Sequence, residues 1–172
     1  MEIGEAFDLI SRAIDSHRLP GGYLVVGDLQ GNTRELVQRI LAKLYPDDAD
    51  KIAAKTHPDV AYLEPAGKAR QIKVDSMREQ IVEPMSSTSY SGGWKVGVVA
   101  GADRMNPQAA NAFLKSLEEP TPNTLYLLLT DRPDAILPTI ISRCQRIDLP
   151  LPSGLLEGDT APAISDVFTP TK

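Results

Sequence analysis

Two short runs of uninterrupted apolar residues constrain the fold of this chain more than any other feature. Residues 23–26 read YLVV, and residues 124–130 read TLYLLLT. Strands of this kind are typical of a sheet that is covered on both faces, where no side of the strand meets water. Residues 59–63, 94–99 and 145–149 add three further predicted strands. The chain is therefore expected to build a buried sheet.

Helices are predicted between these strands. Apolar residues recur at helical spacing in residues 4–16 and from Thr33 onward, and the second helix should end at Tyr45, before a proline. Asp75 is a candidate cap for a helix that carries Met77, Ile81, Val82 and Met85. Asn106 and Pro107 form a strong helix start, and Pro120 stops that helix. Alternating strands and helices predict an α/β fold with three layers and a mainly parallel five-stranded sheet.

The chain of 172 residues is expected to hold one domain over residues 1–150. Residues 90–93 read as a turn. Residues 151–172 are rich in Pro, Gly, Ser and Thr and have no clear period, so they are interpreted as a linker or flexible tail.

Composition excludes several classes of function. The formal net charge is −5, so a broad electrostatic grip on duplex DNA is not expected, and any contact with DNA must be local or made through partners. The single Cys144 excludes an internal disulfide and a multi-cysteine zinc site. The sequence shows neither an apolar run of membrane-spanning length nor a secretory signal, which predicts a cytoplasmic protein.

A phosphate-binding loop is almost present after the first strand. The working motif is G-x-x-x-x-G-K-[ST], whereas residues 27–33 read GDLQGNT. One residue is missing between Gly27 and Gly31, Asn32 replaces the lysine, and Thr33 is retained. Each lost charge-assisted bond to a phosphate should cost about 1.5–3 kcal/mol. We therefore expect no hydrolysis and no tight ATP binding. The plain alternative is that Gly27 and Gly31 only form a tight strand–helix turn.

The second half of such a site is also missing. It is a strand that ends in acidic residues able to hold Mg²⁺ and activate water, but here Ala100 and Gly101 occupy those two positions. Asp103 lies three residues too late to substitute unless the loop is reshaped. The sequence alone leaves two interpretations of this region open, a site released from catalysis and an atypical loop that still works.

Other polar residues have both plain and functional interpretations. Arg143 is either a solvated surface arginine or a phosphate-contacting group. Glu118 and Glu119 either end a helix in solvent or lie at a subunit interface. His57 and Cys144 are interpreted as structural residues. Three basic residues are interpreted as solvated surface and not as a DNA site: Lys68, Arg70 and Lys73.

Several stretches together resemble the bacterial clamp-loader AAA+ subunits of DNA polymerase III. They are residues 102–105 (ADRM), 109–120 (AANAFLKSLEEP), 137–145 (LPTIISRCQ), 57–60 (HPDV) and 72–78 (IKVDSMR). The resemblance covers about residues 4–150 in order. Within this family the chain is most similar to the delta-prime type, which commonly has a degenerate nucleotide site.

This resemblance implies a P-loop NTPase-like core of the AAA+ class and a role in DNA replication. It implies a subunit that lacks ATPase activity of its own but belongs to the polymerase III holoenzyme and helps place the sliding clamp on primed DNA. Its partners would be gamma/tau and delta subunits, and no membrane is implied. Arg143 of the S-R-C motif would be an arginine finger acting in trans. Thr130 matches the sensor-1 position.

The chain departs from the family pattern in three ways. The interval that commonly holds a four-cysteine zinc module has no cysteine, so no metal is expected. The lid and collar domains are expected to be missing after Pro150. No cofactor is expected, because the loop of Gly27, Gly31, Asn32 and Thr33 is degenerate. Two alternatives remain: a gamma/tau-type AAA+ ATPase with an atypical P-loop, and a free-standing interaction module.

Overall fold

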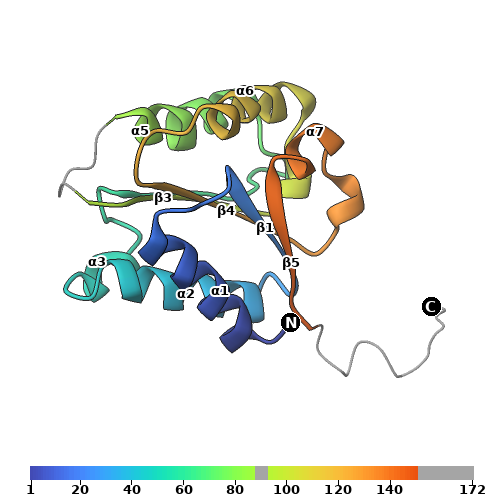
Figure 1. Cartoon of the computed structure of the whole chain (residues 1–172). Coiled ribbons are helices and arrows are strands. Elements are labelled where there is room, and N and C mark those ends of the chain that lie inside the picture. Colours follow the sequence, from blue (N-terminus) through green and yellow to red (C-terminus); the bar gives the residue numbers. More distant parts are fainter. Residues whose placement is uncertain (88–92, 151–172) are drawn as a thin grey trace.

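The computed structural model describes residues 1–87 and 93–150, so the predicted tail and most of the predicted turn at 90–93 lie outside the described residues. Five strands form one sheet: β1 (Gly22–Val26), β2 (Val60–Leu63), β3 (Lys95–Ala100), β4 (Thr124–Thr130) and β5 (Cys144–Asp148). Their order is β2-β3-β4-β1-β5, and every pairing is parallel. The predicted α/β architecture is confirmed (Figure 1).

Helices cover both faces of the sheet (Figure 1). One face carries α1 (Ile3–Ser16), α2 (Asn32–Leu44) and α3 (Ala49–Ala53). The other carries α4 (Val74–Met77), η1 (Arg78–Val82), α5 (Glu83–Ser86), α6 (Pro107–Glu118) and α7 (Pro138–Ile141). Two 3-10 turns, η2 (Ala102–Arg104) and η3 (Pro133–Ala135), follow β3 and β4. Of these, α3, α7 and the 3-10 turns were not predicted, because they are too short to show a period.

The sheet divides the interior into two apolar clusters. Along β1, Tyr23 and Val25 pack with α1 and α2, whereas Leu24 packs with α6 on the opposite side. Successive side chains of a strand point to opposite faces, so an uninterrupted apolar run fills both clusters. Phe113 and Tyr126 meet edge to face at 5.3 Å in the second cluster. These layers explain why β1 and β4 carry so few polar residues, whereas the edge strand β5 is largely exposed and includes Gln145, Arg146 and Asp148.

The helix caps show where local prediction worked and where it failed. The side chain of Asn106 accepts a hydrogen bond of 2.8 Å from the N–H of Ala109, which confirms the predicted start of α6. Asp75 was expected to cap the next helix, but Lys73 holds the cap position and Asp75 lies within the first turn. That helix continues as the π-helical η1 and then as α5, where Pro84 lies near the helix start.

Candidate nucleotide-binding site

Three strands end at the same edge of the sheet and define the candidate site. The ends of β1, β3 and β4 lie together because parallel strands share one direction, and functional groups of such sheets gather at this edge. The backbone N–H of Gly27 donates to the carbonyl of Thr130 at 3.0 Å, which joins the glycine loop directly to the end of β4. The glycine loop and Thr130 are therefore neighbours.

The loop of residues 27–33 makes hydrogen bonds within itself. Asn32 Oδ1 accepts from the N–H of Asp28 at 2.9 Å, and Asp28 Oδ1 accepts from the N–H of Gln30 at 3.1 Å. The carbonyl of Asp28 accepts from the N–H of Gly31 at 3.1 Å and from that of Thr33 at 3.3 Å. A phosphate cradle needs backbone N–H groups that converge on the ligand. Four such groups here already have partners inside the loop.

Side chains of the loop also lie against the backbone of both its glycines. Asn32 Oδ1 approaches the backbone of Gly27 so closely that a Cβ there would lie 2.5 Å from it. The carboxylate of Asp28 lies in the same way against Gly31, at 2.7 Å from a Cβ at that position. The amide nitrogen of Asn32 donates to the carbonyl of Pro150, which ties the loop to the end of the described chain. Uncharged Asn32 stands where the working motif has its lysine, and Asp28 adds a carboxylate elsewhere in the loop.

The retained Thr33 is fully buried, and its hydroxyl donates to the carbonyl of Asp28 at 3.0 Å. In a working P-loop the equivalent hydroxyl binds Mg²⁺. Here its hydrogen is used to close the loop.

The end of β3 carries no acidic residue at the expected positions. Gly101 has a φ of 75°, and a Cβ there would lie 3.0 Å from Cγ of Pro65. An aspartate or glutamate at position 101 would therefore be strained, because its backbone would be left-handed and its Cβ would lie too close to Pro65.

By sequence spacing, Asp103 can reach the end of β4 only if the loop after β3 is reshaped, and the structure shows such a loop. The turn η2 folds its side chain toward β4, where Asp103 Oδ1 accepts from Thr130 Oγ1 at 2.7 Å. Thr130 Oγ1 also accepts from the N–H of Arg132 at 2.9 Å. The side chain of Asp103 is only 5% exposed. Sequence spacing could not reveal this contact, because it depends on how the 3-10 turn reverses the chain.

A small crevice of about 140 Å³ lies at these strand ends. Small-molecule sites usually occupy about 300–1,000 Å³. Its walls include three arginines and three acidic residues: Arg34, Arg70, Arg104, Glu64, Asp103 and Asp131. The charges balance, so the crevice offers no net positive field to a triphosphate.

Arg143 lies at the opposite edge of the sheet. It directly precedes β5, whose first residue Cys144 pairs with Gly22 at the start of β1. Arg143 Nη2 forms an ion pair of 2.8 Å with Glu118 Oε2 at the end of α6, and Nη1 donates to the carbonyl of Thr139 at 3.2 Å. The side chains of Arg143 and Glu118 are 38% and 40% exposed. The arginine thus faces solvent and is held by a neighbouring carboxylate.

His57 and Cys144, interpreted from the sequence as structural residues, both pack inside the protein. His57 is buried, pairs with Asp48 at 2.9 Å and packs on the ring of Tyr45. Cys144 packs against the second cluster, and burial raises the pKa of its thiol to about 12, which makes the nucleophilic thiolate scarce. Lys68, Arg70 and Lys73 are exposed.

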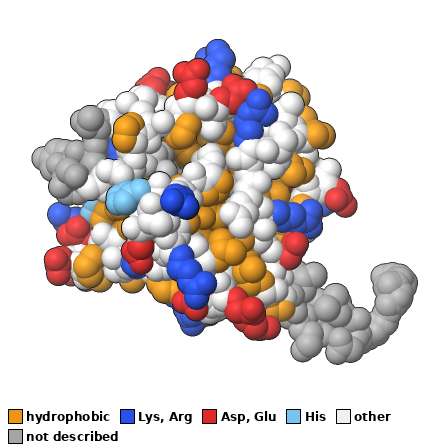
Figure 2. Space-filling view, viewed as in Figure 1, with side chains coloured by type: hydrophobic (Ala, Val, Ile, Leu, Met, Phe, Trp, Pro, Cys, Tyr) orange, Lys and Arg blue, Asp and Glu red, His pale blue; other side chains and the backbone are white. Residues whose placement is uncertain are grey.

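Within the described ranges, no group of three or more His, Cys, Asp or Glu side chains is arranged to hold a metal. None of the helices in those same ranges has the length and apolar character needed to cross a lipid bilayer. Positive and negative side chains are interspersed over the face seen in Figure 2 and do not form one broad basic surface there.

Comparison with known proteins places this chain in a family. The model of the family described as DNA polymerase III, delta subunit, matches residues 4–153. The chain is 46% identical over 101 residues to DNA polymerase III subunit delta' of Pseudomonas aeruginosa, covering 59% of this chain and 30% of that protein. It is 30% identical over 152 residues to the delta' subunit of Bacillus subtilis, covering 81% and 45%. The chain thus spans about a third to a half of these relatives.

Solved structures agree with this placement. A DNA polymerase III gamma subunit-related protein of Thermotoga maritima superposes with a TM-score of 0.68 at 28% identity, covering 87% of this chain and 47% of that one. The Holliday junction branch migration motor RuvB of the same organism gives a TM-score of 0.55 at 11% identity over 86% of this chain and 44% of that one, a likeness of fold alone. With the family match over residues 4–153, the parallel sheet and the altered glycine loop, this chain belongs to the delta-prime type of bacterial DNA polymerase III clamp-loader AAA+ subunits.

Proposed function

We propose that this chain is a non-hydrolysing delta-prime-type subunit that helps load the sliding clamp on primed DNA and donates Arg143 to the ATP site of a neighbouring subunit. The observation that carries the proposal is the closed loop. The N–H groups of Asp28, Gln30, Gly31 and Thr33 are hydrogen-bonded inside the loop, so a triphosphate would have to displace four bonds without gaining a lysine.

The position of Arg143 supports action in trans. The strand β5 runs from Cys144 toward the edge that carries the glycine loop, and its five residues span about 16 Å at roughly 3.3 Å per residue. Arg143 is therefore about one strand length away from the loop of its own chain. A guanidinium there can meet only a nucleotide that belongs to another molecule. Partners of the gamma/tau and delta types would supply that nucleotide.

Glu118 gives Arg143 a definite position before a partner arrives. Together with the carbonyl of Thr139 and the hydroxyl of Ser142, 3.3 Å from Nη1, it holds the guanidinium at the end of α6. A phosphate oxygen can replace a carboxylate oxygen in a bidentate contact with arginine. Because the pair is half exposed, it contributes only about 0–1 kcal/mol, so exchanging Glu118 for phosphate is inexpensive.

The test is ATP turnover in a complex reconstituted from this chain, gamma/tau and delta subunits, the clamp and primed DNA. Arg143→Ala should lower turnover of the partner by roughly 10³-fold, the scale associated with arginine fingers. Arg146→Ala is the matched control, because Arg146 is an exposed arginine that pairs with Asp148 on β5. Unchanged turnover with Arg143→Ala would remove the proposed role in trans.

A gamma/tau-type ATPase with an atypical loop is the alternative function. It is favoured by the retained Thr33 and by relatives such as DNA polymerase III subunit tau of Bacillus subtilis, 33% identical over 90 residues, which is 52% of this chain and 15% of that protein. The buried hydroxyl of Thr33, used to close the loop, weighs against it. Calorimetry with Mg-ATP distinguishes the two functions, because micromolar binding with turnover by this chain alone would support the alternative.

A further inference from the structure

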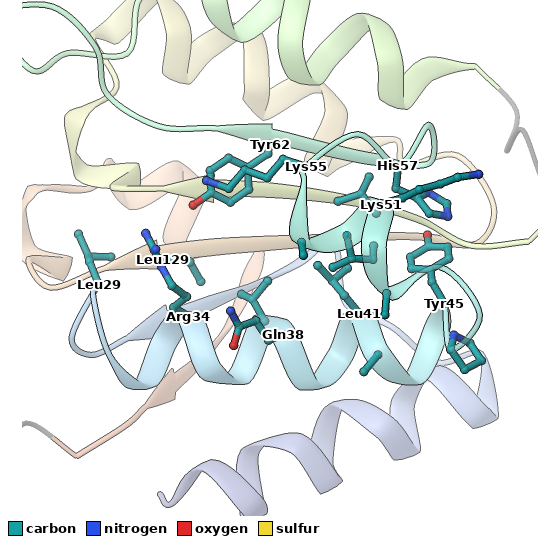
Figure 3. Close-up of a pocket in the computed structure, with 17 residues that line it drawn as sticks. Leu29, Arg34, Gln38, Leu41, Tyr45, Lys51, Lys55, His57, Tyr62 and Leu129 are labelled. Atoms are coloured by element: carbon teal, nitrogen blue, oxygen red, sulfur yellow. The ribbon is translucent and has the colours of Figure 1, made fainter.

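A groove of about 530 Å³ lies between α2, α3 and the edge strand β2, on the face of the sheet opposite α7 (Figures 1 and 3). Val37 and Leu41 of α2, Leu129 of β4 and Val60 of β2 line it. The side chains of Val37, Leu41 and Leu129 belong to the first apolar cluster, so the groove opens directly onto the core. The hydrogen bonds that close the glycine loop and the ion pair of Arg143 with Glu118 lie outside this groove.

The charged side chains that line the groove are all basic. Two acidic residues lie next to the lining, Asp48 against His57 and Glu64 against Tyr62. The lining includes Arg34, Lys51 and Lys55 and contains no aspartate or glutamate, although the whole chain carries a net charge of −5. Lys55 Nζ lies 4.1 Å from the ring centroid of Tyr62. Across residues 1–87 and 93–150, neither Lys51 nor Lys55 forms a salt bridge. These cations remain available to an anionic group.

The cations lie toward the two ends of the groove. In Figure 3, Arg34 and Lys55 lie toward the end marked by Leu29, and Lys51 lies toward the end marked by Tyr45. Along α2, residues 34 to 45 span about 16 Å at roughly 1.5 Å per residue. An extended peptide covers the same distance in about five steps of roughly 3.3 Å. The groove therefore matches about six residues of extended chain with acidic residues at both ends.

The Tyr45 end of the groove is fixed before any ligand binds. The hydroxyl of Tyr45 donates to the carbonyl of Trp94 at 2.6 Å, and its ring lies 4.3 Å from the ring of His57. Asp48 pairs with His57, so the imidazole is already used inside the protein. A preformed surface avoids part of the ordering cost of binding.

We propose that this groove binds a short segment of a partner protein that has apolar side chains between flanking carboxylates. The apolar floor accepts the central side chains, and Arg34 with Lys55 at one end and Lys51 at the other pair with the acids. The surface is separate from the arginine proposed to act in trans, because Arg143 pairs with Glu118 at the end of α6 and α6 covers the opposite face of the sheet. The groove would give the proposed subunit a second surface for binding a partner protein.

The experiment uses fluorescein-labelled synthetic peptides and fluorescence anisotropy with the full chain at low salt. The acidic peptide ELLFLE should bind about tenfold more tightly than the isosteric neutral peptide QLLFLQ, and KLLFLK should bind least. Lys51→Ala combined with Lys55→Ala should remove most of the advantage of the acidic peptide while leaving the neutral one unchanged. Lys68→Ala combined with Lys115→Ala removes the same charge outside the groove and should have no effect.

A second variant separates loss of the groove from loss of folding. Ala42→Trp places a large ring in the lining and should abolish binding of both ELLFLE and QLLFLQ, while circular dichroism shows a folded protein. Equal affinity for ELLFLE and QLLFLQ, or binding that survives both the double lysine variant and Ala42→Trp, would overturn the proposal. The assay needs no ATPase partner, so its result is separate from the test of Arg143.

Discussion

Thr130 donates its hydroxyl hydrogen to Asp103 across 2.7 Å, although the two residues are 27 positions apart in the chain. The bond connects the end of β4 to the turn after β3, beside the glycine loop, whose Gly27 N–H donates to the carbonyl of Thr130. Both partners are buried, and Thr130 also accepts from the N–H of Arg132. The contact makes a sensor-like threonine part of the folded scaffold.

Thr130→Val should therefore destabilise the protein. Valine has a similar shape but leaves the carboxylate of Asp103 without this donor, at a cost of about 1–3 kcal/mol. Urea unfolding measures the change in the free energy of unfolding. Thr139→Val, at an exposed threonine, is the matched control and should change that free energy by less than about 0.5 kcal/mol. A neutral Thr130→Val would mean that the bond contributes nothing to folding.

Asn32→Lys restores the lysine of the working motif, but we expect no binding of Mg-ATP. The loop is still one residue short, Asp28 still places a carboxylate in it, and the substitution removes the acceptor for the N–H of Asp28. Loss of that bond should lower the free energy of unfolding by about 0.5–1.5 kcal/mol.

Calorimetry with Mg-ATP and urea unfolding check this expectation. Asn111→Lys, at an exposed asparagine on α6, adds the same charge away from the loop and controls for it. Micromolar binding of Mg-ATP by Asn32→Lys would contradict the prediction and show that the single lysine was the missing element.

The thiol of Cys144 should make stability fall in alkali. Burial raises its pKa from 9.0 to about 12, so between these values the folded protein keeps a proton that the unfolded protein loses. Since the folded state then binds more protons, the free energy of unfolding decreases as the pH rises. The contribution is complete below about pH 9 and is lost toward about pH 12, at no more than about 1.4 kcal/mol per pH unit.

Urea unfolding at about pH 9 and about pH 10 measures this loss, and Cys144→Ala should reduce it. The pKa of the buried Tyr23 is also raised, to about 12, so a residual alkaline loss should persist in Cys144→Ala above about pH 10. An identical pH dependence in the two proteins would show that the thiol titrates normally when folded.

The sequence by itself determined the five strands, the longer helices and their order along the chain. Uninterrupted apolar runs predicted β1 and β4, helical spacing predicted α1 and α2, and Asn106 with Pro107 predicted the start of α6. These patterns are readable because burial on both faces and the capping of backbone N–H groups are local requirements. The substitutions in the glycine loop are visible for the same reason, since the working motif is contiguous.

Tertiary structure decided which separate residues meet. The 3-10 turn after β3 brings Asp103 to Thr130, and the packing of α6 against α7 brings Glu118 to Arg143. The groove is formed by side chains from α2, α3 and β2, and no single segment shows its size or its charge. Such contacts depend on the strand order β2-β3-β4-β1-β5, which follows from the packing energy of the whole chain and leaves no local pattern in the sequence.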